Sequence, residues 1–165
     1  MRKLSTLFAL LLVSLFCLQV SAQTRYLDEV FSSVAVEEVT YASNISLLTG
    51  SPAPVDLKAD IYTPEGDTAT NRWVMMMCHS GNFLPPIVNG AYNGTKNDSS
   101  ITEMCRRFAK MGYVAISFEY RLGWNPVSPD QNVRTGTILN AAYRGLQDAR
   151  TMVRFLRKSV AEKDN

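Results

Sequence analysis

The hydrophobic and polar positions of residues 33–62 indicate antiparallel β-strands, with strict alternation over Asp56–Tyr62. Val34–Tyr41 is rich in β-branched residues. Within Asp56–Tyr62, the apolar residues Leu57, Ala59 and Ile61 alternate with charged and polar ones. A period of two places alternate side chains on opposite faces of a sheet. We therefore expect two antiparallel strands with one face buried and the other in water.

Two later segments are apolar at nearly every position, as strands covered on both faces are. They are WVMMMC at Trp73–Cys78 and YVAISF at Tyr113–Phe118. The pattern between them predicts a helix over 100–111, with Gly112 placed to cap its C-terminus. Strand, helix and strand in this order predict a parallel crossover. We expect Trp73–Cys78 to be a central strand.

The helix expected over 100–111 has a recognisable start and one apolar face. Ser100 and Glu103 stand at the spacing of a capping box. Four apolar residues recur at helical spacing and predict the buried face. They are Ile101, Met104, Cys105 and Phe108.

A second, longer helix is predicted from about Thr137 to Lys158. Its expected buried stripe consists of Ile138, Ala141, Ala142, Met152, Val153 and Leu156. Its basic residues, Arg144, Arg150, Arg154, Arg157 and Lys158, could form a nucleic-acid patch. We favour a solvated helix face interleaved with Asp148, because the chain as a whole is close to neutral.

Residues 1–22 have the pattern of a secretory signal peptide. A basic start at Arg2 and Lys3 precedes an apolar run over Leu7–Val20, and small residues at Val20-Ser21-Ala22 suit a signal peptidase. The apolar run is shorter than the roughly 20 residues that a membrane-spanning helix needs. We expect the mature chain to comprise residues 23–165, to be secreted or periplasmic, and to hold no membrane segment.

Composition and charge remove several classes of function. Arg2 and Lys3 supply the whole formal charge of +2, so the remaining chain has 15 basic and 15 acidic residues. A balanced chain has no electrostatic preference for nucleic acid or an anionic membrane. The single histidine, His79, excludes a site built from several histidines. No phosphate-binding glycine motif occurs, and we expect no metal and no cofactor.

Two cysteines, Cys78 and Cys105, remain after removal of the signal peptide. An oxidising compartment permits a disulfide between them. Two buried free thiols are an equally reasonable expectation. The oligomeric state is left open.

The segment His79-Ser80-Gly81-Asn82-Phe83, directly after the apolar strand, carries the candidate chemistry. A nucleophile elbow with Ser80 is disfavoured, since Cys78 and Asn82 stand where an elbow needs small residues. An oxyanion hole fits better. Gly81 and Asn82 tolerate the unusual dihedrals that let consecutive backbone N–H groups face one acceptor.

Four segments in order resemble the carboxylesterase and lipase branch of the α/β-hydrolase family. DLKADIYTPEG is similar to the family's LxLDIYxP strand, and WVMMMCHSGNF to a strand that runs into H-G-G-G-F. FAKMGYVAISFEYRLG and GLQDARTMVRFLRK are similar to the next helix, strand and turn and to the helix before the nucleophile. The resemblance covers about Val55–Lys158. It implies an α/β fold, in which antiparallel strands lead into parallel strands with a crossover helix.

The resemblance also implies roles for individual residues. The backbone N–H groups of Gly81 and Asn82 would be the oxyanion donors, and His79, Ser80 and Phe83 would support the loop. Tyr120, Arg121 and Asp148 would be scaffold residues. The sequence departs from the family at Ser80 and Asn82, where glycines are usual, so a side chain enters the site at Asn82.

The family's nucleophile motif G-x-S-x-G is absent, and there is no second histidine. We therefore expect the N-terminal portion of a carboxylesterase acting on small ester substrates, truncated before the nucleophile elbow and inactive alone. The strand Tyr113–Phe118 would then carry an unpaired edge. The alternatives are a fragment of a related peptidase or carbohydrate esterase, and a non-catalytic secreted binding protein with a degenerate hydrolase fold.

Overall fold

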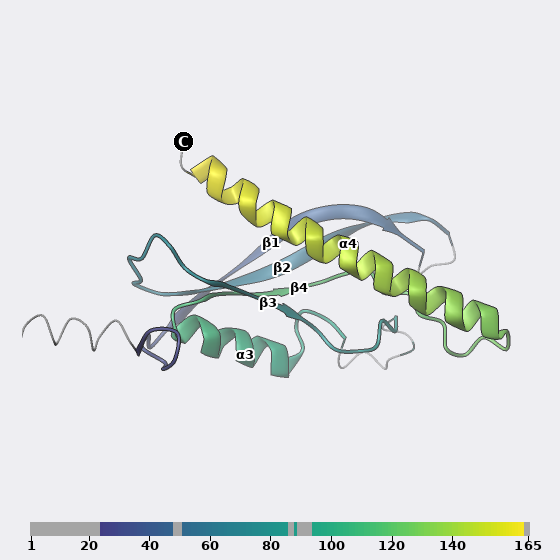
Figure 1. Ribbon diagram of the computed structural model, residues 1–165, viewed down its shortest axis with the longest axis horizontal. Helices are drawn as coiled ribbons and strands as arrows, with labels where there is room; N and C mark the ends of the chain where they lie inside the picture. Colours follow the sequence, from purple (N-terminus) through teal and green to yellow (C-terminus); the bar gives the residue numbers. More distant parts are fainter. Residues whose placement is uncertain (1–23, 48–50, 86–87, 89–93, 164–165) are drawn as a thin grey trace, which may run out of the picture.

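The computed structural model describes residues 24–47, 51–85, 88 and 94–163 (Figure 1). The signal peptide predicted over 1–22 lies outside the described residues. So does much of the loop that follows Pro85. The four strands of the sheet and the two helices that pack on it all lie within the described ranges.

The chain forms a mixed α/β fold around a four-stranded sheet. The elements in order are β1 (Val34–Ser46), β2 (Ala53–Pro64), β3 (Val74–Cys78), α3 (Ser99–Lys110), β4 (Val114–Phe118) and α4 (Gln131–Lys163). The strands lie in the order β1-β2-β4-β3. Two antiparallel pairings, β1 with β2 and β2 with β4, lead into one parallel pairing of β3 with β4. The expected α/β fold class is thus confirmed at this level.

The two helices cover opposite faces of the sheet, which gives three layers (Figure 1). Alternate residues of β4 divide between them, as the pleat requires. Ile116 and Phe118 pack in one fully buried cluster with Met152 of α4. Ala115 packs in a second cluster with Cys105 and Ala109 of α3.

The predicted positions of the two apolar strands in the sheet are wrong. β4 lies between β2 and β3, and Ala115, Ile116, Ser117 and Phe118 have no exposed area. β3, which we expected to be central, is one of the two edge strands among the described strands, with β1 at the other edge, and Val74 is 48% exposed. The unpaired edge therefore belongs to β3 rather than to Tyr113–Phe118. Both segments are equally apolar, so composition alone could not order them.

The expectation of one buried and one solvated face on β2 is only half right. Leu57 and Ala59 are buried as predicted, at 3% and 0% exposure. Asp60 and Tyr62 on the other face are also buried, beneath α3 and the segment before it. Asp60 is compensated by Lys96, whose Nζ donates to both carboxylate oxygens at 2.7 and 2.8 Å. A buried charge requires such a partner.

Helix α3 begins one residue earlier than predicted and without the capping box. Asp98 occupies the N-cap position, and its backbone carbonyl accepts from the Thr102 N–H. Ile101 and Cys105 are buried as predicted, whereas Met104 is 43% exposed. Gly112 takes φ 101° just beyond the helix, which is the left-handed conformation expected of a glycine there.

Helix α4 is longer than predicted at both ends. It begins after Asp130, whose carboxylate accepts from the Asn132 N–H at 2.8 Å as an N-cap does. Ala141 and Met152 are buried as expected, but Ala142 is exposed. Asp148, expected on the solvated face, has no exposed area. Among the described residues, no helix combines the length and hydropathy needed to cross a bilayer.

Candidate oxyanion loop

The loop that begins at His79 leaves the carboxyl end of β3 with an unusual backbone. Three successive residues have positive φ: Gly81 at 107°, Asn82 at 53° and Phe83 at 59°. Glycine adopts this conformation freely and asparagine more readily than most residues, whereas phenylalanine does so at a cost. The Leu84 N–H donates to the Gly81 carbonyl at 2.9 Å and closes the turn.

The backbone N–H groups of Gly81 and Asn82 lie in the positive-φ turn directly after β3. In the described part of the chain, no hydrogen bond joins either N–H to another group. Asn82 is exposed and Gly81 half-buried, so a ligand can approach both. Two neighbouring N–H groups without internal acceptors are what an oxyanion hole requires. Their role as donors stays a prediction.

His79 anchors the start of the loop against Tyr120. The Tyr120 hydroxyl donates to the His79 carbonyl oxygen at 2.6 Å, and the two rings stack with centroids 4.2 Å apart. Burial holds the pKa of the His79 imidazole below its usual value, so the ring is neutral at pH 7. Nδ1 lies 2.8 Å from the Ser80 carbonyl oxygen, which can only accept, so Nδ1 carries the proton.

Phe83 fixes the far side of the turn. Its carbonyl oxygen accepts from the N–H groups of Gly123 and Trp124 at 2.9 and 3.0 Å. Its ring meets the edge of Tyr120 with centroids 5.7 Å apart. Gly145 of α4 leaves room for it, because a Cβ there would lie 3.1 Å from the Phe83 ring. Phe83 and His79 therefore pack on the same tyrosine.

Ser80 is exposed and is not activated by the histidine. Its Oγ lies 3.5 Å from the Asp98 carboxylate, at the limit of a hydrogen bond. The His79 ring meets the Ser80 carbonyl instead, and no contact of the described residues joins the ring to Ser80 Oγ. This geometry agrees with the rejection of Ser80 as a nucleophile, because a nucleophilic serine needs a base within hydrogen-bond reach of Oγ.

Asp98 ties the two ends of this loop together, and sequence reasoning missed it. The buried carboxylate accepts from the N–H groups of Gly94 and Thr95 at 3.0 and 3.1 Å, and from Ser80 Oγ. The available signal was an N-cap residue type directly before Ser99 and Ser100. The capping-box spacing of Ser100 and Glu103 instead predicted that the helix begins at Ser100.

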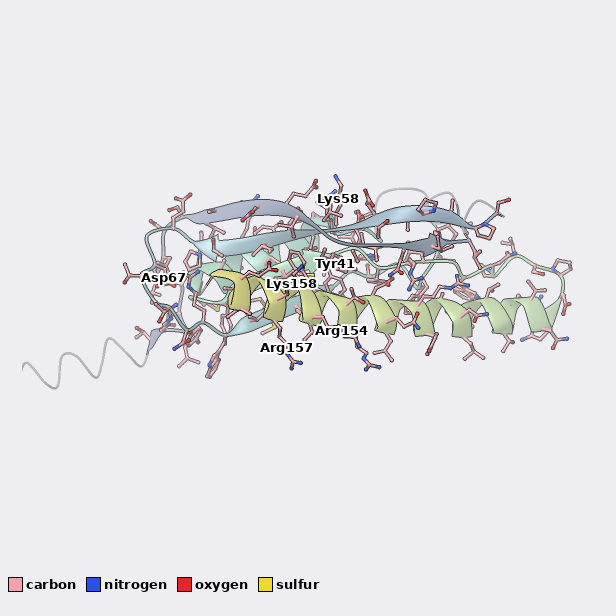
Figure 2. All side chains as sticks on the ribbon, turned by 90° about the horizontal axis from the view of Figure 1, so that it is seen from above. Tyr41, Lys58, Asp67, Arg154, Arg157 and Lys158 are labelled. Atoms are coloured by element: carbon pink, nitrogen blue, oxygen red, sulfur yellow. The ribbon has the colours of Figure 1, made fainter. Side chains whose placement is uncertain are left out.

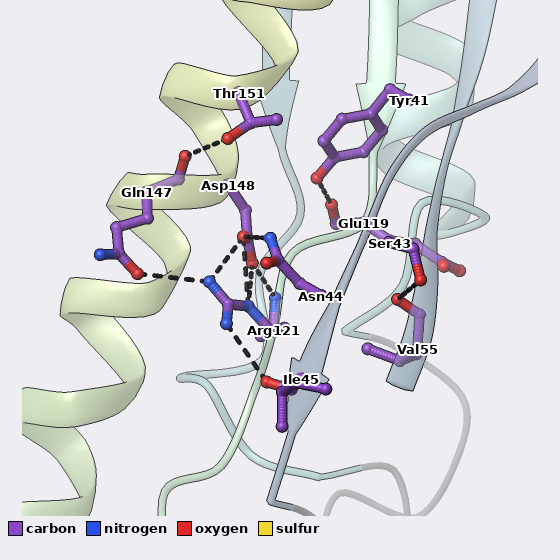
Figure 3. A network of polar contacts seen from close by, with 10 residues as sticks. All are labelled: Tyr41, Ser43, Asn44, Ile45, Val55, Glu119, Arg121, Gln147, Asp148 and Thr151. Atoms are coloured by element: carbon purple, nitrogen blue, oxygen red, sulfur yellow. Dashed lines mark hydrogen bonds and ion pairs between the residues drawn. The ribbon is translucent and has the colours of Figure 1, made fainter. Parts of the chain in front are cut away.

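Arg121 and Asp148 form the scaffold contact that joins the turn after β4 to α4 (Figure 3). The Asp148 carboxylate accepts from Nε and Nη2 of Arg121 at 2.8–3.1 Å and from its backbone N–H at 2.9 Å. Asn44 Nδ2 of β1 adds a further bond at 3.1 Å. Arg121 Nη1 also reaches the Ile45 carbonyl at 3.2 Å. The buried carboxylate therefore fixes both β1 and the turn after β4 to the helix.

A small cavity of about 210 Å³ lies beside the loop and is bordered by His79, Tyr120 and Glu119. Glu119 is half-buried, and burial raises the pKa of its carboxyl group. The Tyr41 hydroxyl donates to the Glu119 backbone carbonyl and holds this residue in place (Figure 3). Sequence reasoning did not single out Glu119. Its position directly after an apolar strand was the signal that could have identified it.

The cysteines are free thiols on opposite faces of the sheet. Cys105 lies under the face that α3 covers, and Cys78 follows Met76 in the register that faces α4. A disulfide would have to pass through the sheet, so the two thiols are free. The expectation that both are buried is right for Cys105 and wrong for Cys78, which is exposed at the end of the edge strand β3. The described residues contain no group of three or more His, Cys, Asp or Glu side chains arranged to hold a metal.

Comparison of the chain with family models, with curated proteins and with solved structures found no match. The assignment of function therefore rests on the residues and their geometry. The structure brings together all five residues of the predicted loop, 79–83, at the end of β3. It places Tyr120, one of the expected scaffold residues, against His79 and Phe83, and it adds Asp98 as a further group that holds the loop.

Proposed function

We propose that this chain provides the oxyanion-binding loop of a secreted, carboxylesterase-like serine hydrolase that acts on carboxylic esters. The observation that carries the proposal is the backbone of Gly81 and Asn82. Both have positive φ directly after β3, and neither N–H has an acceptor among the described residues. Antiparallel strands that lead into a parallel pair with a crossover helix support the same assignment.

In such a reaction a serine oxygen attacks the carbonyl carbon of an ester, and the carbonyl oxygen becomes an anion. Two fixed N–H donors stabilise that anion, and the loss of one costs about 3 kcal/mol in a well-studied case. Collapse of the tetrahedral intermediate expels the alcohol and leaves an acyl-enzyme, which water hydrolyses. Gly81 and Asn82 act at the first step and at its counterpart during deacylation.

The sequence assigns no nucleophile or base to this chain. It contains one histidine and no G-x-S-x-G. His79 is buried and bonded to the loop itself, and Ser80 Oγ faces Asp98. We therefore propose that the chain turns over no ester by itself and that its contribution is the oxyanion donors.

Binding of a tetrahedral oxyanion tests this proposal. Ethyl methylphosphonate carries its charge on oxygens around a tetrahedral phosphorus, as the reaction intermediate does around carbon. We expect Asn82→Gly to bind it at least as tightly as the wild-type chain, because the N–H stays and the positive φ becomes free of strain. Gly81→Val should weaken binding at least tenfold, because a β-branched residue does not adopt φ near 107°.

Two controls complete the experiment. Each titration is repeated in an Arg154→Gln background, which separates this loop from the cationic surface of α4. Hydrolysis of p-nitrophenyl acetate is compared between the wild-type chain and Ser80→Ala, and equal rates are expected. Equal phosphonate affinity in Gly81→Val and wild type would contradict the proposal, as would turnover that Ser80→Ala abolishes.

The principal alternative is a non-catalytic secreted binding protein with a degenerate hydrolase fold. The observation in its favour is that the one histidine is held by Tyr120 and the Ser80 carbonyl, and that no hydrogen bond among the described residues joins its ring to a hydroxyl group. That alternative predicts no difference between Asn82→Gly and Gly81→Val toward the phosphonate. Both variants would then differ from the wild-type chain in stability alone.

A further inference from the structure

A groove unrelated to the oxyanion loop runs along the exposed side of α4. It has a volume of about 320 Å³ and lies where α4 passes the end of β1 and the turn after β4. Asn44 comes from β1, Arg121 from the turn, and Gln147, Arg150 and Arg154 from α4. The groove therefore gathers side chains from three parts of the chain.

The helix presents a continuous row of polar side chains to this groove. Tyr143, Gln147, Arg150 and Arg154 line it and follow one another at spacings of four, three and four residues. This spacing places all four on one face of a helix, with neighbouring side chains about 5–6 Å apart at Cβ. Arg150 and Arg154 thus lie one turn apart on the same row.

The groove has a net positive charge. Arg121 is matched by the buried Asp148 carboxylate, with which it forms an ion pair of 2.8 Å. Arg150 and Arg154 have no ion pair among the described residues, and no acidic residue lines the groove. The charge of these two guanidinium groups is therefore left for a ligand.

The positive charge is concentrated on α4 rather than spread over the molecule. Between Gln131 and Lys163 the helix contains seven basic and two acidic residues, whereas residues 24–130 contain eight basic and twelve acidic ones. Figure 2 shows Arg154 and Arg157 projecting side by side from the helix. A field of this kind attracts a compact anion to α4, while the acidic remainder disfavours a long polyanion that spans the molecule.

We propose that this groove binds a phosphate or sulfate group, either as the free ion or as a monoester of a small molecule. The guanidinium groups of Arg150 and Arg154 supply paired N–H donors, which suit the oxygens of such a group. Gln147 Oε1 accepts from Arg121 Nη2 at 3.3 Å, which leaves the Gln147 NH₂ group as a further donor. Arg121 acts as a positioning residue, since it fixes the orientation of Gln147.

Calorimetric titration of the full chain with inorganic phosphate and with sulfate at low ionic strength tests the site. We expect saturable binding by the wild-type chain and at least a fivefold weaker affinity in Arg150→Gln and in Arg154→Gln. Arg157→Gln is the matched control, because it removes the same charge from the same helix outside the groove lining. Its affinity should stay within twofold of wild type.

The outcomes distinguish a specific anion-binding site from general electrostatic attraction to the positive charge of α4. Equal weakening in Arg157→Gln and Arg154→Gln would overturn the proposal, as would the absence of saturable binding of either anion. Phenyl phosphate distinguishes the two forms of ligand. Tighter binding than inorganic phosphate, through contact with the exposed Tyr143 ring, assigns a monoester, and equal binding assigns the free ion. Each titration is repeated in a Gly81→Val background, which removes the contribution of the oxyanion loop, and the differences among the three arginine variants should persist there.

Discussion

The hydroxyl group of Tyr120 donates to the backbone carbonyl of His79 at 2.6 Å, and the two rings stack 4.2 Å apart. His79 comes directly after the end of β3, and Tyr120 comes two residues after the end of β4. β3 and β4 are parallel neighbours in the sheet. Their carboxyl ends therefore meet at one edge of the sheet. This pair is the contact that sets where the positive-φ turn at Gly81–Phe83 lies.

Removal of this hydroxyl should loosen the loop without disturbing the core. Tyr120→Phe keeps the ring stack and loses one hydrogen bond to a buried carbonyl, which typically costs about 1 kcal/mol. Urea unfolding would measure the loss. Tyr143→Phe, at a residue that is 63% exposed, serves as the control and should change the free energy of unfolding by less than about 0.5 kcal/mol. Equal effects in the two variants would contradict the role of Tyr120.

The Arg121–Asp148 pair should be among the most sensitive positions of the fold. Asp148 has no exposed area, and Asp148→Asn would leave a nearly buried guanidinium group without its counter-charge. Breaking a buried pair in this way costs about 3–5 kcal/mol. The measurement is the urea midpoint, compared with Glu162→Gln, whose pair with Lys158 is exposed and should contribute little.

A double variant keeps this prediction testable if Asp148→Asn does not fold. Replacing both partners, as Arg121→Met with Asp148→Leu, removes the unpaired charge, and buried pairs exchanged for apolar residues often retain stability. We expect the double variant to be more stable than Asp148→Asn. A double variant no more stable than the single one would show that the pair is not the cause.

Glu119 should make the stability depend on pH with a definite sign. Burial raises the pKa of this carboxyl group, so the folded chain holds the proton more tightly than the unfolded chain does. The wild-type chain therefore loses stability as pH rises from the ordinary glutamate pKa of about 4.3 through the folded value. Glu119→Gln cannot ionise, so its stability relative to wild type should rise over that window and then level off. Thermal unfolding at pH 4 and pH 8 measures the difference, and a constant difference would contradict the account.

The exposed edge of β3 should drive self-association. An apolar edge strand offers unpaired backbone groups to another chain, and Val74 is 48% exposed there. Val74→Lys should reduce concentration-dependent association, measured by light scattering. Val127→Lys is the control: Val127 is a loop residue that is 75% exposed, so the variant adds the same charge away from the β3 edge. If both variants suppress association equally, net charge rather than the β3 edge is responsible.

The sequence predicted the existence of the strands and helices better than their arrangement. Period-two and apolar patterns identified β1 to β4 as strands, but burial follows the patterns only in part. β2 has buried residues on both faces, and the apolar β3 has Val74 48% exposed. The order of the strands depends on long-range pairing between segments of similar composition. Trp73–Cys78 and Tyr113–Phe118 look alike in sequence, yet β4 occupies the centre and β3 the edge.

The sequence indicated the loop and, through the family resemblance, Tyr120 as part of its scaffold, but it did not indicate Asp98. Gly81 and Asn82 are residue types that favour positive φ, so local sequence was sufficient to identify the turn. Asp98 was missed because its carboxylate reaches back to Ser80, Gly94 and Thr95 instead of capping α3. The contact between Asp98 and Ser80 joins residues 18 positions apart, so it depends on the tertiary structure and cannot be predicted from a local sequence pattern.

The most direct test of the central claim is to observe the two N–H groups themselves. In an NMR titration of the ¹⁵N-labelled chain with ethyl methylphosphonate, we expect the amide protons of Gly81 and Asn82 to shift downfield together, with one saturation curve. Amides of α4 near Arg154 should follow a different curve or none. Shifts confined to α4, with Gly81 and Asn82 unmoved at saturation, would contradict the assignment of this loop as an oxyanion hole.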